Sequence, residues 1–225
     1  CLFVSHIREV VVKKYTLIVG LIALVLTVFS MPAVLADGPV DSRAGRAEVR
    51  FMEGMMDHHQ MAVDMGNDCL VKASSESLKA MCQAIIEAQT AEIVQLQEGL
   101  LNWYNVQYTP MPMTAMMDMM DMMETMDGMG GMDHSGMAGM PYTDPPMMMG
   151  MMAGLNRLEG SRYDIAWVES MIDHHDDAIH MSERLLARVP ESEGHENLRR
   201  FAQQVIDDQT AEIAELENML TEFAG

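Results

Sequence analysis

The stretch FMEGMMDHHQMAVDMG at residues 51–66 decides the fold, because the chain repeats it as WVESMIDHHDDAIHMS at residues 167–182, a shift of 116 residues. The two copies share an aromatic residue, a Glu, an Asp, two adjacent histidines, an Ala and two methionines in the same register. Apolar residues recur in both copies at spacings of three and four, which indicates a helix with one apolar face. A repeat of this length predicts two similar helical halves.

A second pair of matching segments follows the first pair. The sequence QTAEI occurs at residues 89–93 and again at residues 209–213, a shift of 120 residues, so the second turn is four residues longer than the first. Two hairpins with one apolar face each have to pack together to bury those faces. We therefore predict an all-α fold, a four-helix bundle built from two repeated helical hairpins with a long Met-rich crossover.

The expected helices follow from the apolar stripes and from the residues that flank them. We expect Asp41 or Ser42 to cap the first helix, and Ser161 with Asp164 to form a capping box at the start of the third. Pro190 should end that third helix. The predicted helices span about 41–72, 78–104, 161–189 and 196–222.

The N-terminal segment is typical of a secretory signal peptide. Lys13 and Lys14 precede an apolar run at residues 15–29, and small residues precede an expected cleavage after Ala36. The alternative is an uncleaved membrane anchor, but a span needs about 20 apolar residues. We therefore expect a periplasmic protein, without a membrane association after cleavage. The predicted organisation is a signal peptide at 1–36, in which 1–12 are interpreted as upstream sequence, a first hairpin at 37–109, the crossover at 110–154 and a second hairpin at 155–225, with both hairpins in one domain.

The charge of the chain limits its partners. The formal net charge is −20, and removal of the signal peptide, which carries a net charge of +2, lowers it to −22. Nucleic acids and anionic membranes would repel such a protein, whereas cations would be attracted to it. The negative charge also promotes solubility. If the charge is considered by itself, solubility is a better explanation of it than the binding of cations.

Two cysteines remain in the mature chain. Cleavage removes Cys1 and leaves Cys69 and Cys82, an even number in an oxidising compartment. A turn near residues 73–77 lies midway between them, so an antiparallel hairpin brings them level. We predict a disulfide. Their counterparts in the second repeat are Leu185 and Ala202, which indicates that ordinary core residues also serve at these positions.

The paired histidines fall on or beside the apolar line of each helix. A single buried histidine is more often a hydrogen-bonded core residue, but two pairs flanked by methionine favour a metal site. Imidazole suits Zn, Cu, Fe and Ni, while thioether selects Cu(I) and its analogue Ag(I). The candidate ligands in the helices are Met55, His58, His59, Met65, Met171, His174, His175 and Met181. Whether they form one shared site or two stays open.

Other polar residues have weaker assignments. Gln89 and Gln209, with Glu92 and Glu212 nearby, are candidates to hold the second ring nitrogen of the histidines, and a helix-to-helix hydrogen bond is the alternative. His180 and His195 are expected to be exposed rather than ligands. The polar residues of the first helix fall opposite its apolar face, namely Glu53, Asp57, Gln60, Asp64 and Asp68.

The crossover differs from the helices in its amino-acid composition. Residues 110–154 contain 18 of the 28 methionines in a background of Gly, Pro and Asp, so they cannot build a packed core. Three thioethers brought together by a flexible backbone suffice to hold Cu(I). The alternatives are a pliable apolar patch for a partner protein and a sink for oxidants. The candidate ligands here are Met116, Met117, Met119, Met120, Met122, Met123, Met126, His134 and Met137.

The phrase Met55-x-x-His58-His59-x-x-Ala62-x-x-Met65, its second copy and the Gln-x-x-Glu-Ile that follows each resemble the ferritin-like family catalogued as domain of unknown function 305. Two copies joined by a Met-rich crossover resemble a periplasmic copper-binding protein, and residues 132–140 resemble the Met/His repeats of bacterial copper-resistance proteins. These resemblances imply copper binding, a periplasmic location and a role in copper resistance. Cys69 and Cys82 depart from the pattern, which leaves thiol participation open.

Three functions are compatible with these features. We expect a non-enzymatic protein that binds Cu(I), or Ag(I) as its analogue, and buffers it or passes it to a copper exporter or another periplasmic copper protein. The second candidate is a ferritin-like di-metal oxidase, which requires Glu-x-x-His motifs that occur nowhere in the chain. The third is an adaptor whose Met-rich loop grips a partner protein.

Overall fold

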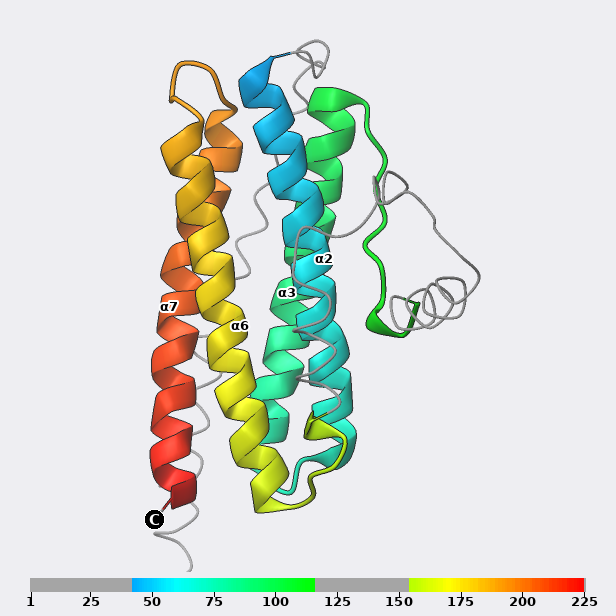
Figure 1. Cartoon of the computed structure of the whole chain (residues 1–225), viewed down its shortest axis with the longest axis vertical. Coiled ribbons are helices and arrows are strands. Elements are labelled where there is room, and N and C mark those ends of the chain that lie inside the picture. Colours follow the sequence, from blue (N-terminus) through cyan, green and yellow to red (C-terminus); the bar gives the residue numbers. More distant parts are fainter. Residues whose placement is uncertain (1–41, 116–153, 225) are drawn as a thin grey trace, which may run out of the picture. The chain divides into compact units, whose positions relative to one another are not determined.

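The fold consists of long helices. The structure is a computed structural model that describes residues 42–115 and 154–224, all of which belong to one compact unit. Within those ranges every long element is a helix and no strand occurs: α2 spans Arg43–Lys72, α3 Glu76–Tyr104, α6 Ser161–Arg188 and α7 Glu196–Ala224 (Figure 1). The predicted all-α class is confirmed. The predicted signal peptide and most of the crossover lie outside the described residues. In the part that is described, no helix is both long and apolar enough to cross a membrane.

The helices pack in pairs. α2 contacts α3 and α6 contacts α7, each pair running antiparallel, and α2 also packs on α6 (Figure 1). Ser42 caps α2 as predicted, because its hydroxyl accepts a hydrogen bond from the Gly45 amide at 2.8 Å. Ser75 caps α3 in the same way. α2 approaches α3 closely at Gly66, where a Cβ atom would lie 2.6 Å from the Ile86 side chain.

The predicted capping box at the start of α6 is wrong. The cap residue is Gly160, which makes no side-chain hydrogen bond to the helix. The carboxylate of Asp164 instead accepts three hydrogen bonds from the turn between α2 and α3, from Ser74 N at 2.9 Å, Ser74 Oγ at 2.6 Å and Ser75 N at 3.0 Å. Three donors in a neighbouring turn outcompete the single donor of its own helix, and Asp164 thereby ties the two hairpins together.

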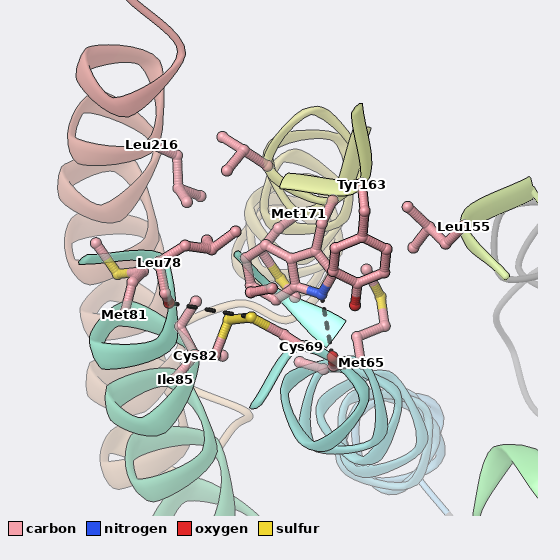
Figure 2. Close-up of a cluster of buried hydrophobic side chains, with 14 of the residues drawn as sticks. Met65, Cys69, Leu78, Met81, Cys82, Ile85, Leu155, Tyr163, Met171 and Leu216 are labelled. Carbon is pink, nitrogen blue, oxygen red and sulfur yellow. Dashed lines mark hydrogen bonds between the residues drawn. A yellow bond between two sulfur atoms is a disulfide. The ribbon is translucent and has the colours of Figure 1, made fainter. Parts of the chain in front are cut away.

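A buried cluster fills the space beside that turn. It includes Cys69 and Cys82, which form the predicted disulfide, and the aromatic residues Tyr163 and Trp167 from α6 (Figure 2). The indole Nε1 of Trp167 donates to the carbonyl oxygen of Met65 at 3.0 Å. Both tryptophan and methionine are completely buried there. This cluster is the main apolar contact between the hairpins at this end.

The acidic face of α2, which the helical wheel places opposite the apolar face, is partly covered. The chain after α3 turns back along this face. Asp57, only 2% exposed, accepts hydrogen bonds from Tyr108 Oη at 2.5 Å and from Met111 N at 3.1 Å. Asp64 accepts from Met113 N at 2.7 Å. The first residues of the predicted crossover therefore belong to the packed structure, and a helical wheel cannot anticipate a covering segment.

At the opposite end of α2 a polar cluster joins the hairpins. His195, expected to be exposed, has a side chain only 19% exposed and stacks on Trp103 with ring centroids 4.4 Å apart. Its Nδ1 lies 2.6 Å from Oε2 of the buried Glu48, its amide donates to Oε1 at 2.7 Å, and Tyr104 donates its hydroxyl to the same carboxylate. Burial alone raises the pKa of Glu48, but hydrogen bonds from His195 and Tyr104 outweigh it and lower that pKa. His195 was predicted to be exposed, and it lies in the interior instead because it pairs with the buried Glu48 carboxylate.

Candidate metal centre

The two histidine pairs meet midway along α2 and α6. The rings of His58 and His174 stack with their centroids 3.7 Å apart and their planes tilted by 32°. Nε2 of His174 lies 3.0 Å from the carbonyl oxygen of His58, and each residue is 2% exposed. The two helices run antiparallel, so each copy of the repeat provides the surroundings of the other. The structure thus brings the two copies into one shared centre.

The second histidine of each pair points to the partner helix of its own hairpin. Nε2 of His59 lies 2.7 Å from Oε2 of Glu92 on α3, and Nε2 of His175 lies 2.7 Å from Oε2 of Glu212 on α7. Both histidine side chains are fully buried. The same pair therefore occurs twice, once in each hairpin. Each carboxylate therefore lies against its ring, at the place where the sequence predicted a glutamine with the glutamate nearby.

The glutamines themselves have a different environment. Gln89 and Gln209 are each 2% exposed, so both lie in the interior as predicted. In the described part of the chain, Oε1 of Gln89 and both amide atoms of Gln209 have no hydrogen-bond partner. Neither residue makes the predicted contact with a histidine. They add unpaired polar atoms to the core.

The stacked histidines are neutral. Burial, followed by the nearby His59 and His175, holds the pKa of His58 well below its ordinary value of 6.5. Burial and then His58 itself lower the pKa of His174 in the same way. A neutral imidazole carries one nitrogen lone pair that can bind a metal. The centre therefore presents two neutral rings at neutral pH, each with one nitrogen lone pair.

Several ring nitrogens of the centre lack a partner. Among the described residues, none makes a hydrogen bond to either nitrogen of His58 or to Nδ1 of His174, and the same holds for Nδ1 of His59 and His175. A buried polar atom without a partner costs about 1–3 kcal/mol. Four imidazoles with free nitrogens in an apolar interior fit the donor set that a soft or borderline metal ion requires.

Thioethers lie on both sides of the stacked rings. Met55 and Met171 each precede a central histidine by three residues, about 4.5 Å along the helix axis, and both are completely buried. Because the helices are antiparallel, the two methionines lie on opposite sides of the histidine pair. A further methionine, Met61, was not predicted from the sequence; it is 5% exposed and shares the buried cluster of Met171. Its spacing of three residues after His58 was the available signal.

Two predicted ligands lie further away. Met65 and Met181 follow the central histidines by seven residues, about 10 Å along each helix. Met65 is completely buried, but it belongs to the cluster around the disulfide, and Met181 is partly exposed. His180 is exposed, as expected. The candidates in the crossover lie outside the described residues: Met116, Met117, Met119, Met120, Met122, Met123, Met126, His134 and Met137.

The centre differs from a carboxylate-rich metal site. In residues 42–115 and 154–224, no three His, Cys, Asp or Glu side chains converge closely enough to hold a metal ion by themselves. Glu53 is partly exposed and Glu169 exposed, although both precede the histidines in sequence. The side chains that approach one another are the imidazoles of His58 and His174, and a single carboxylate lies beside each of His59 and His175.

A model of the domain of unknown function 305, DUF305, matches residues 48–220. The chain belongs to this family. The match includes both copies of the His-His phrase and the helices α3 and α6 in full. No curated protein matches the chain.

Solved structures of DUF305 proteins share the fold of this chain. A DUF305 protein from Streptomyces coelicolor, predicted to be secreted, is 22% identical with a TM-score of 0.54, over 80% of this chain and 94% of that chain. CopM in its Cu(I)-bound form is 21% identical with a TM-score of 0.54, over 79% and 98% of the two chains. A DUF305 fragment from Deinococcus radiodurans is 21% identical with a TM-score of 0.55, over 78% and 96%. CopM is also known in Cu(II)-bound and silver-bound forms. At these identities the similarity establishes the fold.

Proposed function

We propose that this DUF305 protein binds Cu(I), and Ag(I) as its analogue, at the centre where His58 and His174 stack between α2 and α6. The observation that carries this proposal is the pair itself: two buried, neutral imidazoles with centroids 3.7 Å apart, in which no described residue satisfies either nitrogen of His58 or Nδ1 of His174. A monovalent soft ion would use these lone pairs. The similarity in fold to CopM, which binds copper and silver, supports the same assignment.

The neighbouring residues favour Cu(I) over harder ions. Met55 and Met171 lie one turn from the central histidines and supply thioethers, which select soft cuprous ions. Glu92 and Glu212 orient His59 and His175 rather than facing the central pair, a common function of residues outside the ligand set. We infer that the two repeated hairpins close into one four-helix bundle, with this donor set at its middle.

A binding role fits the chain better than catalysis. A ferritin-like oxidase would need a Glu-x-x-His motif on each of two helices in addition to inward carboxylates. Glu92 and Glu212 do lie against His59 and His175. However, Glu53 and Glu169, at the positions nearest to such a motif, are partly or fully exposed. A non-enzymatic carrier needs only a site that holds and releases its cargo. We propose that the Met-rich crossover captures copper and that the buried centre retains it, in a periplasmic protein that contributes to copper resistance or delivers copper to an exporter.

The proposal is tested by anaerobic titration of the mature protein with Cu(I) in competition with a chromophoric chelator. His58→Ala/His174→Ala should remove the tightest class of site, whereas His180→Ala, which changes an exposed histidine on the same helix, should leave it intact. A variant without residues 116–153 should keep the tight site and lose the weaker ones. Tight binding that survives in the double histidine variant, with helix content unchanged by circular dichroism, would sink the assignment.

A further inference from the structure

The four histidines form one row through the interior. On either side of the central pair, the ring centroids are 6.0 Å apart between His174 and His175 and 6.2 Å apart between His58 and His59. The two central rings are 3.7 Å apart. None of the four residues is more than 2% exposed. An ion from solvent can therefore reach the central pair only by way of the residues around the row.

A glutamate that reaches the surface lies at each end of the row. Oε2 of Glu212 on α7 is 2.7 Å from Nε2 of His175, and the glutamate side chain is 27% exposed. Oε2 of Glu92 on α3 is 2.7 Å from Nε2 of His59, and this side chain is only 12% exposed. Each glutamate thus connects solvent with a fully buried imidazole, and Glu212 is the more open of the two.

The two glutamates lie on helices that are not packed tightly together. α2 packs on α3, α6 on α7 and α2 on α6, whereas the described helices α3 and α7 make little contact with each other. Burial is the main cause of a raised pKa at Asp208 on α7, and the negative charges of Glu92 and Glu212 raise that pKa further. Three carboxylates therefore lie near one another between these helices, where their combined charge attracts cations.

Unsatisfied polar atoms accompany the carboxylates. Gln89 lies one turn before Glu92 and Gln209 one turn before Glu212, and each glutamine is 2% exposed. In the part of the chain that the structure describes, Oε1 of Gln89, both amide atoms of Gln209 and Oδ2 of Asp208 are buried without a hydrogen-bond partner. Buried polar atoms without a partner are rare in folded proteins, and unpaired oxygen atoms can contact a cation.

This arrangement is suited to pass an ion on rather than to retain it. Side chains of His, Cys, Asp and Glu do not converge in groups of three within the described residues, so an ion beside Glu212 would have too few ligands to stay there. A soft ion also prefers imidazole and thioether to a carboxylate oxygen. It therefore gains affinity when it exchanges Glu212 for His175, and again when it reaches the stacked pair.

We propose that Glu212 and His175 form an entry point through which a soft monovalent cation, Cu(I) or Ag(I), passes from solvent between α3 and α7 to the stacked rings of His58 and His174. This inference rests on the copper-binding function proposed above and adds the route by which the ion reaches its site. The ion exchanges ligands along the row and keeps its oxidation state. Glu92, with less than half the exposure of Glu212, leaves His59 at the closed end of the row.

The test is the rate of loading, followed by stopped-flow tryptophan fluorescence after mixing with silver nitrate in a chloride-free buffer. Trp167, which is completely buried on α6 seven residues before His174, reports the arrival of the heavy ion. Glu212→Gln should slow loading by about tenfold, and Glu92→Gln by less than about twofold. Both variants remove one carboxylate from the same kind of pair, so an effect through the orientation of the ring alone would be equal in the two.

The equilibrium affinity separates the route from the site. A group on the route changes the entry and exit rates together, so Glu212→Gln should change the loading rate more than the affinity measured by chelator competition. Higher ionic strength should slow the loading of the wild-type protein and affect Glu212→Gln less. Asp208→Asn, which removes a neighbouring carboxylate, should slow loading as well.

Three outcomes would contradict the route. Slowing by Glu92→Gln that equals or exceeds that by Glu212→Gln, or no slowing by either, overturns the entry point and leaves the histidine centre untouched. If Glu212→Gln fails to fold, as judged by circular dichroism, an unchanged loading rate in Asp208→Asn overturns it instead. The absence of a tight site in the wild-type protein would overturn the proposed function and the route together.

Discussion

The two hairpins agree at the histidine centre and differ in the other interactions that stabilise them. His59 and His175 each lie 2.7 Å from a glutamate of their own hairpin. In contrast, within the part of the chain that the structure describes, the first hairpin alone carries a disulfide, and Asp57 on its acidic face is buried whereas the counterpart Asp173 is exposed. We conclude that the sequence repeat preserves the histidine centre, whereas the interactions that stabilise each hairpin are specific to that hairpin.

The largest expected effect concerns the polar cluster that ties the second hairpin to the first. His195→Ala would remove the imidazole that pairs with the buried Glu48 carboxylate, while the backbone amide of residue 195 would still donate to it, so we expect the free energy of unfolding to fall by about 3–5 kcal/mol at pH 7. Urea denaturation measures this loss. His180→Ala, an exposed change in the same half, should alter the stability by less than about 0.5 kcal/mol. Equal stabilities for the two variants would contradict the role assigned to the cluster.

Making the first hairpin resemble the second sharpens the comparison. Cys69→Leu/Cys82→Ala removes a bridge across 13 residues, which we expect to lower the free energy of unfolding by about 3 kcal/mol. The loss should shrink to nothing when the wild-type protein is measured in its reduced form. A variant as stable as the oxidised wild type would mean that the bridge adds no stability.

The shared centre should make stability depend on acidity. The pKa values of His58 and His174 lie well below 6.5 in the folded state, so below about pH 6.5 the unfolded chain binds protons that the folded chain does not. Stability is therefore complete above that pH and falls as the pH drops, by about 3 kcal/mol per unit for two histidines. In His58→Ala/His174→Ala the slope between pH 6.5 and 5 should be much smaller. An unchanged slope would place the acid sensitivity elsewhere.

The smallest expected effect concerns the covered acidic face. Tyr108→Phe removes one hydrogen bond to Asp57, and we expect a loss of about 1 kcal/mol in the free energy of unfolding. Asp173→Asn, at the uncovered counterpart, should change stability by less than about 0.5 kcal/mol. Thermal unfolding of both variants tests whether the covering segment stabilises α2. A larger loss from Asp173→Asn would reverse the comparison.

Sequence reasoning succeeded where local patterns decide the structure. The period of the apolar residues predicted all four helices to within a few residues, and the spacing of Cys69 and Cys82 about a turn predicted their disulfide. It also placed both histidine pairs on the interior face. These features depend on residues within one helix or one hairpin, which a helical wheel represents well.

The wrong predictions concern residues that form hydrogen bonds with a part of the chain far away in sequence. Asp164 accepts hydrogen bonds from a turn about 90 residues away in sequence instead of capping its own helix. His195 is drawn inward by Glu48, 147 residues away. Whether the two His-His phrases form one centre could not be decided either, because it depends on the register of α2 against α6.

The most direct test of the shared centre is Cu(I) competition with the single variants His58→Ala and His174→Ala beside the double variant. If one ion is held by both rings, each single variant should lose the whole tight site, and the double variant should lose no more than either. Two independent sites would instead give half the loss in each single variant and the full loss only in the double. That second result would contradict the account of one copper centre built from both copies of the repeat.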